Sequence, residues 1–320
     1  MKKIILMFTA SLVLNACNTS KKESETPNAV ETVTITHSQG TTIIPVNPKR
    51  VVALDFASLE NLDKVGANVV GMPKLAVPSN LKKYEEDQNI VNVGSLVEVN
   101  MEAINELQPD FIIIGGRLAA SYKTLSKIAP TIITNFDTQD PLGALQKDLQ
   151  NLAKIFNAEN VYDTLYDDLQ QKITNIRQAI ENSNDKALVV LHNRGRFSAY
   201  GSGSRFGLIH DVLKVKEAAK GLDTHLHGTR ASSEFIKETN PDILFVVDRS
   251  AAIGEKALEQ TDVENELIQR TKAYNNNKIV YLNSEAWYLS GTGGITSINV
   301  MVDEIQKVFE PESTNLATAE

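Results

Sequence analysis

Apolar residues recur along the chain at two different periods, and each period predicts a different element. Positions spaced three and four apart predict helices, most clearly at 142–155 and 160–182. Unbroken apolar runs predict buried strands at 51–54, 111–114, 131–134, 188–191, 243–247 and 278–282. Buried strands that alternate with helices predict an α/β fold whose parallel sheets are covered by helices.

One segment of the chain occurs twice. EAINELQPDFIII at 102–114 and EFIKETNPDILFV at 234–246 share Glu, Ile, Glu, Pro and Asp at the same offsets. Each copy predicts a short helix that ends before the proline and is followed by a buried strand. Arg117 and Arg249 come at the same offset behind these strands. A spacing of about 130 residues predicts two related lobes rather than a solenoid of short repeats.

The two periodic helices lie between the repeats. We expect an N-terminal lobe at 33–140, connecting helices at 141–184, a C-terminal lobe at 185–311 and a short tail at 312–320. At 1.5 Å per residue the second helix would be about 35 Å long, which is enough to join two lobes.

The N-terminus has the layout of an export signal. Lys2 and Lys3 precede an apolar run at 4–14 that is too short to span a bilayer. LNAC at 14–17 resembles the bacterial lipobox, which implies a signal peptide at 1–16 and a lipid on Cys17. The polar composition of 17–32 predicts a flexible tether. A transmembrane anchor or an ordinary signal is the alternative to an exported, lipid-anchored protein.

Composition excludes several classes of function. The net charge of -8 argues against a nucleic-acid binder, and one cysteine can form neither an internal disulfide nor a Cys-rich zinc site. No G-x-S-x-G, H-E-x-x-H or P-loop motif occurs, so an exported hydrolase is a weak alternative. In GSGSRFG at 201–207, Phe206 replaces the third glycine of a dinucleotide loop. SGTGG at 290–294 predicts a tight loop that leads into a helix N-cap.

Arginines at strand ends are the candidate chemistry. Arg117 and Arg249 follow strands at the carboxyl edge of a sheet, where open α/β folds bind ligands, and Arg205 follows a strand-like FSAY segment. Guanidinium groups stay charged and present planar sets of donors, so these three residues favour an anionic ligand with several oxygens. Ordinary surface ion pairs are the alternative.

Five segments carry a family resemblance that extends from about 45 to 308. PKRVVALD (48–55), LQPDFIIIGGR (107–117), SAYGSGSRFGLIHDVL (198–213), NPDILFVVDR (240–249) and WYLSGTGGITS (287–297) resemble the periplasmic siderophore-binding lipoproteins. The likeness is greatest to the Fe(III)-catecholate binders of the enterobactin-uptake and petrobactin-uptake kind. It implies a non-enzymatic receptor of an ABC importer, with two α/β lobes joined by one long helix, the class III or helical-backbone fold.

The resemblance also implies roles for individual residues. Arg117, Arg205 and Arg249 would hold the anionic iron complex, while Tyr288 and His227 would ligate the iron when the siderophore leaves coordination positions open. His225 is the alternative histidine, and a ring that only packs beside Trp287 is the alternative for Tyr288. The Fe(III)-siderophore is the transported ligand, and no intrinsic cofactor is expected. Two catecholates fill four of the six positions of Fe(III), whereas three catecholates fill all of them.

Glu102 and Glu234 begin the two repeats, and the resemblance implies that they dock onto the permease dimer of an importer driven by an ATPase. Their alternative role is that of helix N-terminal carboxylates. We expect a monomer. A hydroxamate siderophore, haem or cobalamin is the alternative ligand, and five scattered histidines argue against a zinc or manganese receptor.

Overall fold

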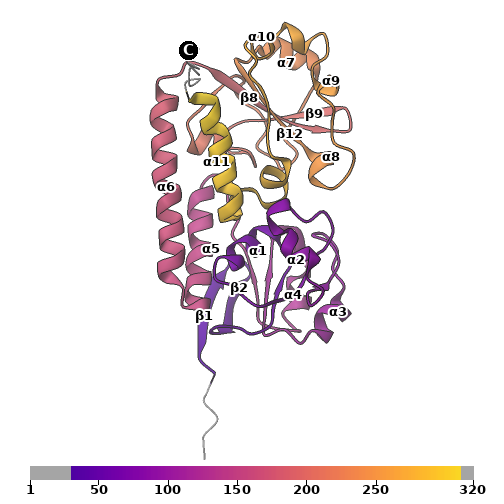
Figure 1. Cartoon of the computed structure of the whole chain (residues 1–320), viewed down its shortest axis with the longest axis vertical. Helices are drawn as coiled ribbons and strands as arrows, with labels where there is room; N and C mark the ends of the chain where they lie inside the picture. The colour runs from indigo at the N-terminus through magenta and orange to yellow at the C-terminus, as the bar shows by residue number, and fades with distance from the viewer. Residues whose placement is uncertain (1–29, 311–320) are drawn as a thin grey trace, which may run out of the picture. The chain divides into compact units, whose positions relative to one another are not determined.

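Two separate sheets form the centres of two lobes (Figure 1). The structure, a computed structural model, describes residues 30–310. The predicted signal peptide, Cys17, most of the tether and the tail at 312–320 lie outside these residues. Within residues 30–310 there is no helix of the length and apolarity needed to cross a membrane.

The N-terminal sheet is entirely parallel, with the strand order β5-β4-β3-β6-β7. Its strands are β3 (Val51–Ala53), β4 (Val69–Met72), β5 (Val91–Asn92), β6 (Phe111–Ile114) and β7 (Thr131–Ile133). The helices of this lobe are α1 (Phe56–Asp63), α2 (Lys82–Glu86), α3 (Met101–Glu106) and α4 (Tyr122–Leu125). An antiparallel hairpin, β1 (Thr32–His37) and β2 (Gly40–Pro45), precedes the sheet. The sequence patterns predicted β3, β6 and β7 but not β4, β5 or the hairpin.

The C-terminal sheet is mixed, which differs from the expected parallel sheet. β8 (Lys186–Asn193), β12 (Ile243–Asp248) and β13 (Ile279–Tyr281) are parallel, and β10 (Lys216–Glu217) pairs with β8 in parallel. β9 (Arg196–Tyr200) and β11 (Thr229–Ala231) run antiparallel. The reason is a two-residue turn at Arg194 and Gly195, both at positive φ (50° and 77°), which folds β9 back onto β8.

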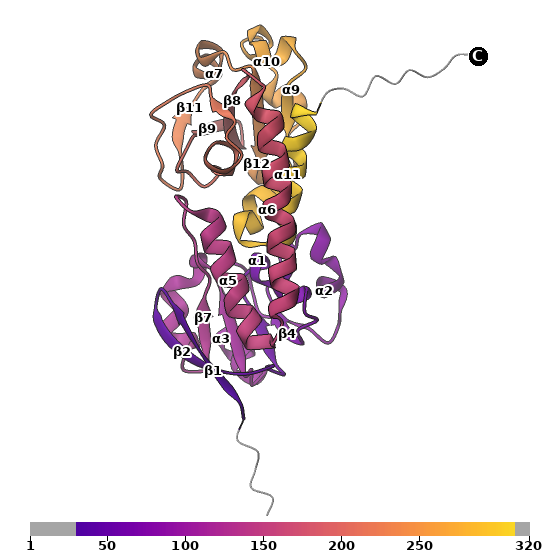
Figure 2. The ribbon, with the colours of Figure 1, turned by 90° about the vertical axis from the view of Figure 1, so that its left-hand side faces the viewer.

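Helices complete the second lobe and connect the two. α7 (Ser233–Thr239), α8 (Arg249–Ala252), α9 (Gln260–Val263) and α10 (Lys272–Asn275) belong to the C-terminal lobe. The connecting helices are α5 (Pro141–Phe156) and the 23-residue α6 (Glu159–Glu181), which lie within two residues of the predicted ranges. The last helix is α11 (Ile295–Phe309), which packs against α6 (Figures 1 and 2).

Burial explains why α6 can serve both lobes. Its apolar residues at spacings of three and four, Leu169, Ile173, Ile176 and Ile180, are almost fully buried, whereas the rest of the helix is largely polar. They belong to one continuous core that also includes residues of both sheets. The predicted fold class, two α/β lobes joined by a long helix, is confirmed.

Candidate functional site

The two repeat arginines occupy corresponding places at the carboxyl edges of the two sheets. Arg117 lies in a 3-10 turn, Gly116–Ser121, directly after β6. Arg249 is the first residue of α8, directly after β12, and the Asp248 side chain caps that helix by accepting the Ser250 backbone N–H at 2.9 Å. The repeat in the sequence therefore corresponds to a repeat in three dimensions.

Arg205 comes from the glycine-rich loop after β9. The loop is tied down because the Asp211 carboxylate accepts the Gly203 backbone N–H at 2.6 Å and the Ser204 hydroxyl donates to the Gly201 carbonyl at 2.6 Å. Phe206 is fully buried and belongs to the core. The loop thus positions an arginine and an aromatic core residue, as expected from the absence of the third glycine.

All three arginines converge on Tyr288. Arg117 Nη2 and Arg205 Nη2 donate to the Tyr288 carbonyl oxygen at 3.0 and 3.1 Å. Arg249 Nε donates to the Tyr288 hydroxyl at 2.9 Å. The Arg205 guanidinium carbon also lies 4.5 Å from the centre of the Tyr288 ring, a cation–π distance. A residue of the N-terminal lobe and three of the C-terminal lobe therefore form one cluster.

The positive charges of the cluster are not held in salt bridges within the described part of the chain. Within residues 30–310, no carboxylate forms a salt bridge with Arg117, Arg205 or Arg249, whereas Arg194 pairs with Glu255. Burial lowers the pKa of Arg205, and the positive charge of Arg117 acts in the same direction. Surface ion pairing does not describe these three residues, and an anion that meets all of them would relieve their mutual repulsion.

Tyr288 is held in a short π-helical turn, Glu285–Ser290. Its neighbour Trp287 is buried and donates its indole N–H to the Glu304 carboxylate of α11 at 2.8 Å. Ser79, from the N-terminal lobe, donates its backbone N–H and its hydroxyl to Glu285 at 2.8 and 3.0 Å. Trp287 therefore anchors the turn, and the half-buried Tyr288 ring faces Arg205 and Arg249.

The two histidines lie on the loop before β11. His227 and His225 are both exposed, and the His225 Nε2 atom lies 3.7 Å from the Asp223 carboxylate. Among the described residues, no hydrogen bond joins either histidine to Tyr288. Gly228 has φ +63°, and a Cβ there would lie 2.8 Å from the Tyr200 ring, so the glycine after His227 fixes the loop against β9.

Glu102 and Glu234 occupy equivalent exposed positions in the first turns of α3 and α7. The side chains of Asn100 and Ser232 cap these helices. Each accepts a hydrogen bond from the backbone N–H three residues later, at 3.0 and 3.3 Å. The Ser232 hydroxyl lowers the pKa of Glu234. Both carboxylates thus have the geometry of helix N-terminal acids and stay available to an external partner.

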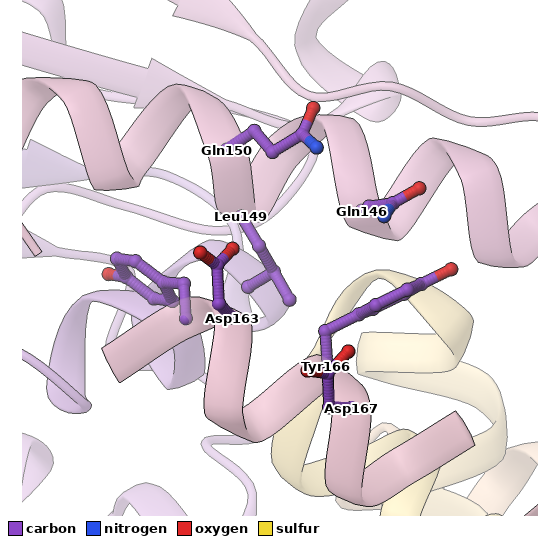
Figure 3. Close-up of a pocket in the computed structure, with 7 residues that line it drawn as sticks. Gln146, Leu149, Gln150, Asp163, Tyr166 and Asp167 are labelled. Carbon is purple, nitrogen blue, oxygen red and sulfur yellow. The ribbon is translucent and has the colours of Figure 1, made fainter. Parts of the chain in front are cut away.

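Two hollows of the surface lie outside the cluster, and one of them is lined by Ser250, the residue after Arg249. One of about 150 Å³ lies between α5 and α6, lined by Gln146, Gln150, Asp163, Tyr166 and their neighbours (Figure 3). The other, of about 340 Å³, lies beside His192 and Glu255. Neither is lined by a predicted ligand-binding residue. Across residues 30–310, no group of three or more His, Cys, Asp or Glu side chains could hold a metal ion.

Sequence reasoning missed two groups of site residues. Asn193 lies at the carboxyl end of β8, and its side-chain oxygen is 3.5 Å from Arg249 Nη1. Its place at a strand end could have identified it, as it identified the arginines. Glu60 and Asn61 are buried in α1 and bond to the segment after Tyr288. No local signal distinguishes them, because an acid within a helix is normally at the surface.

Known proteins match both the chain and the fold. A family model described as periplasmic binding protein matches residues 51–286. The petrobactin-binding protein YclQ of Bacillus subtilis is 40% identical, over 97% of this chain and all of the relative, and its crystal structure superposes with a TM-score of 0.84, covering 88% of this chain and all of that one.

Two further solved structures are similar throughout. The siderophore-binding protein BauB, bound to a complex between two molecules of acinetobactin and ferric iron, is 36% identical with a TM-score of 0.82, covering 88% of this chain and 99% of that one. The catecholate-siderophore binding protein VctP of Vibrio cholerae is 31% identical with a TM-score of 0.82, covering 87% and 100%. The chain belongs to the periplasmic binding protein family.

Proposed function

We propose that this protein is the receptor of an ABC importer and captures an Fe(III)-siderophore of the catecholate type. The observation that carries the proposal is the convergence of Arg117, Arg205 and Arg249 on Tyr288 without a carboxylate partner among residues 30–310. A ferric catecholate is an anion rich in oxygen acceptors, which guanidinium groups bind well. The arginines would attract and orient this anion, and the protein would bind it without converting it chemically.

Each guanidinium has donors left for such a ligand. A guanidinium has five N–H donors. In the described structure Arg205 uses one nitrogen, on the Tyr288 carbonyl, and Arg117 uses two, on the Tyr288 and Leu289 carbonyls. These are neutral acceptors, so an anion can compete with them at a smaller cost than it would meet in breaking salt bridges.

Tyr288 is the residue that we propose to contact the metal. Phenolate oxygen is a hard donor that suits Fe(III), and Arg249 donates to this same oxygen. His227, or His225 in its place, would fill a second open position of a tetradentate complex. Both histidines lie with exposed side chains on the loop before β11, so either imidazole is accessible to a ligand.

The relatives support the ligand class. YclQ is a petrobactin-binding protein, VctP a catecholate-siderophore binding protein, and BauB holds a ferric complex of two siderophore molecules. Membership of a binding-protein family supports a receptor over the exported hydrolase. Hydroxamate siderophores, haem and cobalamin are less suited to three uncompensated guanidinium groups.

The remaining parts of the proposal concern delivery. A lipid on Cys17 would hold the exported protein, as a monomer, at the membrane. Glu102 and Glu234, exposed at the equivalent helix starts of the two lobes, would each contact one subunit of the permease dimer. Their equivalence supports this role, since a two-fold partner calls for the same group on each lobe.

The test is a titration of the chain from residue 18 with four ligands: Fe(III)-bis-catecholate, Fe(III)-tris-catecholate, a ferric hydroxamate and haem. Trp287, the single tryptophan, reports binding because it precedes Tyr288. We expect tight quenching by at least one catecholate complex and weak or no quenching by the others. Tight binding of haem or hydroxamate alone would contradict the catecholate assignment and leave only the family.

A further inference from the structure

Glu60 is a buried acid that forms no salt bridge among the described residues. It lies in the middle of α1, and every residue of this helix from Phe56 to Leu62 is buried. Only 1% of Glu60 is exposed, and within residues 30–310 no salt bridge involves it. A buried carboxylate is costly unless hydrogen bonds satisfy it, so its donors should reveal what it is for.

All of these donors come from the segment that follows Tyr288. The Ser290 and Ser297 hydroxyls donate to Glu60 Oε1 at 2.8 and 2.6 Å, and the Ser297 backbone N–H donates to Oε2 at 2.8 Å. Ser297 lies in the first turn of α11, so the carboxylate also meets the positive end of that helix. The two carboxylate oxygens therefore accept three hydrogen bonds from this one segment.

The next residue of α1 strengthens the same connection. The Asn61 side chain donates to the Gly293 carbonyl and accepts from the Ile295 backbone N–H, both at 2.9 Å. The hydroxyl of Tyr162, on α6, donates to the Asn61 backbone carbonyl at 2.9 Å. Side chains of α1 therefore hold both ends of the short loop 290–297, and the connecting helix holds α1.

Glycine makes this close approach possible. A Cβ on Gly294, the N-cap of α11, would overlap the Glu60 carboxylate, and a Cβ on Gly293 would lie 3.3 Å from the Ala57 side chain. The glycines of SGTGG thus let the backbone reach a carboxylate. Their loop leads into a helix N-cap, as the sequence predicted, and the group that completes the cap comes from the other lobe.

We propose that Glu60 is a positioning residue that fixes the Tyr288 segment to the N-terminal lobe. Ser290 comes two residues after Tyr288 and donates to Glu60. Ser79 and Arg117 of the N-terminal lobe also donate hydrogen bonds to this turn. Although this turn belongs to the C-terminal half of the chain, hydrogen bonds tie the segment that follows it to α1. This inference rests on the proposed function.

The test uses Glu60→Gln, which keeps the shape of the side chain. It replaces one of the two carboxylate oxygens, both of which accept hydrogen bonds, by an NH2 group. One donor of Ser290 or Ser297 then loses its acceptor. We expect the affinity for Fe(III)-bis-catecholate, which needs Tyr288, to fall about tenfold. Affinity for Fe(III)-tris-catecholate, whose coordination is complete, should change by less than about twofold. Ser297→Ala, a milder change, should show the same selectivity with a smaller loss.

The matched control is Asp148→Asn, which alters another buried carboxylate of the same half of the molecule that does not contact the Tyr288 segment. It should leave both affinities unchanged. Equal losses for both ligands in Glu60→Gln would show that Glu60 has only a structural role, and unchanged affinities in both Glu60→Gln and Ser297→Ala would overturn the inference.

A measurement without ligand separates this inference from the proposed function. Hydrogen exchange of the amides at 285–290 should be faster in Glu60→Gln than in the wild type, while exchange in α5 stays the same. If those amides exchange at the wild-type rate, the inference fails even when siderophore binds. If exchange is faster but no catecholate binds, the proposed function fails and the positioning role stands.

Discussion

Each lobe contains one copy of the helix–strand repeat, followed by an arginine. The lobes differ in what surrounds the strand of that repeat. The N-terminal sheet is purely parallel, and of the proposed ligand-binding residues it supplies Arg117 alone. The C-terminal sheet contains the antiparallel strands β9 and β11, and the loops next to them supply Arg205 and His227. Under the proposed function, the shared βα frame would provide the anion-binding edge of both lobes, and the antiparallel strands of the second lobe would provide the residues that select the ligand.

Charge reversal at the helix starts should separate docking from capture. Glu102→Lys and Glu234→Lys should each reduce iron uptake by cells to near background, because opposite charge at one lobe cannot meet the same permease surface. Siderophore affinity should stay within about twofold of the wild type, because both residues are exposed in α3 and α7 rather than part of the arginine cluster.

Glu106→Lys and Glu238→Lys are the matched controls, since each lies four residues further along the same helix and is also exposed. They should preserve uptake. If both helix-start reversals transport normally, the two lobes do not dock through these equivalent carboxylates.

The arginines should rank by lobe. The double change Arg205→Gln and Arg249→Gln should weaken binding of the catecholate complex about a hundredfold, because it removes two partly buried charges. Arg117→Gln should cost about tenfold, because Arg117 is exposed and solvent screens its charge. Isothermal titration measures both, with the exposed Arg270→Gln as a control for net charge. A larger loss for Arg117 would reverse the proposed ranking of the lobes.

The loop that carries the histidines should depend on Gly228. Gly228→Ala adds a Cβ 2.7 Å from the Ala199 carbonyl and forces a side chain into positive φ, so it should lower the free energy of unfolding by about 2 kcal/mol. Gly221→Ala is the control, since Gly221 has φ +70° but no neighbour within 4 Å, and it should cost about 1 kcal/mol. Equal losses in chemical denaturation would mean that packing against Tyr200 does not hold this loop.

The last effect concerns pH, is spread over several pH units and belongs to the N-terminal half. Burial raises the pKa of Asp148, on α5, to about 7, against hydrogen bonds from Asn135 that lower it; the charge of Asp55 also raises the pKa, and Lys147 lowers it. Because the folded state binds the proton more tightly than the unfolded state, stability should fall as the pH rises from about 4 to 7 and level off above, by about 1 kcal/mol per pH unit.

Asp148→Asn should flatten this part of the profile. Denaturation at several pH values, followed by Trp287 fluorescence, measures it. Parallel profiles for the wild type and the variant would show that Asp148 does not titrate between these values.

Much of the frame could be predicted because it depends on local pattern. β6 coincides with the predicted apolar run, and α5 and α6 follow their apolar spacing, since burial of one face or of a whole strand imposes a period on the sequence. The direction of β9 could not be predicted in this way. It depends on the turn at Arg194 and Gly195 rather than on the sequence of the strand itself.

The candidate site could be predicted where it repeats, where it follows a strand or where the family resemblance covers it. Arg117 and Arg249 came from the repeat, and Tyr288 came from the family resemblance. Glu60 could not be found, because its burial depends on donors more than 200 residues away in the chain. The sequence pattern does not distinguish His227 from His225 either, since both lie in one exposed loop.

The most direct test of the central claim is the visible absorption spectrum of Fe(III)-bis-catecholate bound to the wild type and to Tyr288→Phe. If the arginine cluster presents Tyr288 to the iron, the charge-transfer band of the bound complex should shift when the phenol oxygen is removed. The arginines should still bind the complex, but with a lower affinity than in the wild type. Identical bands and identical affinities in the two proteins would contradict the account, because Tyr288 would then play no part in capture.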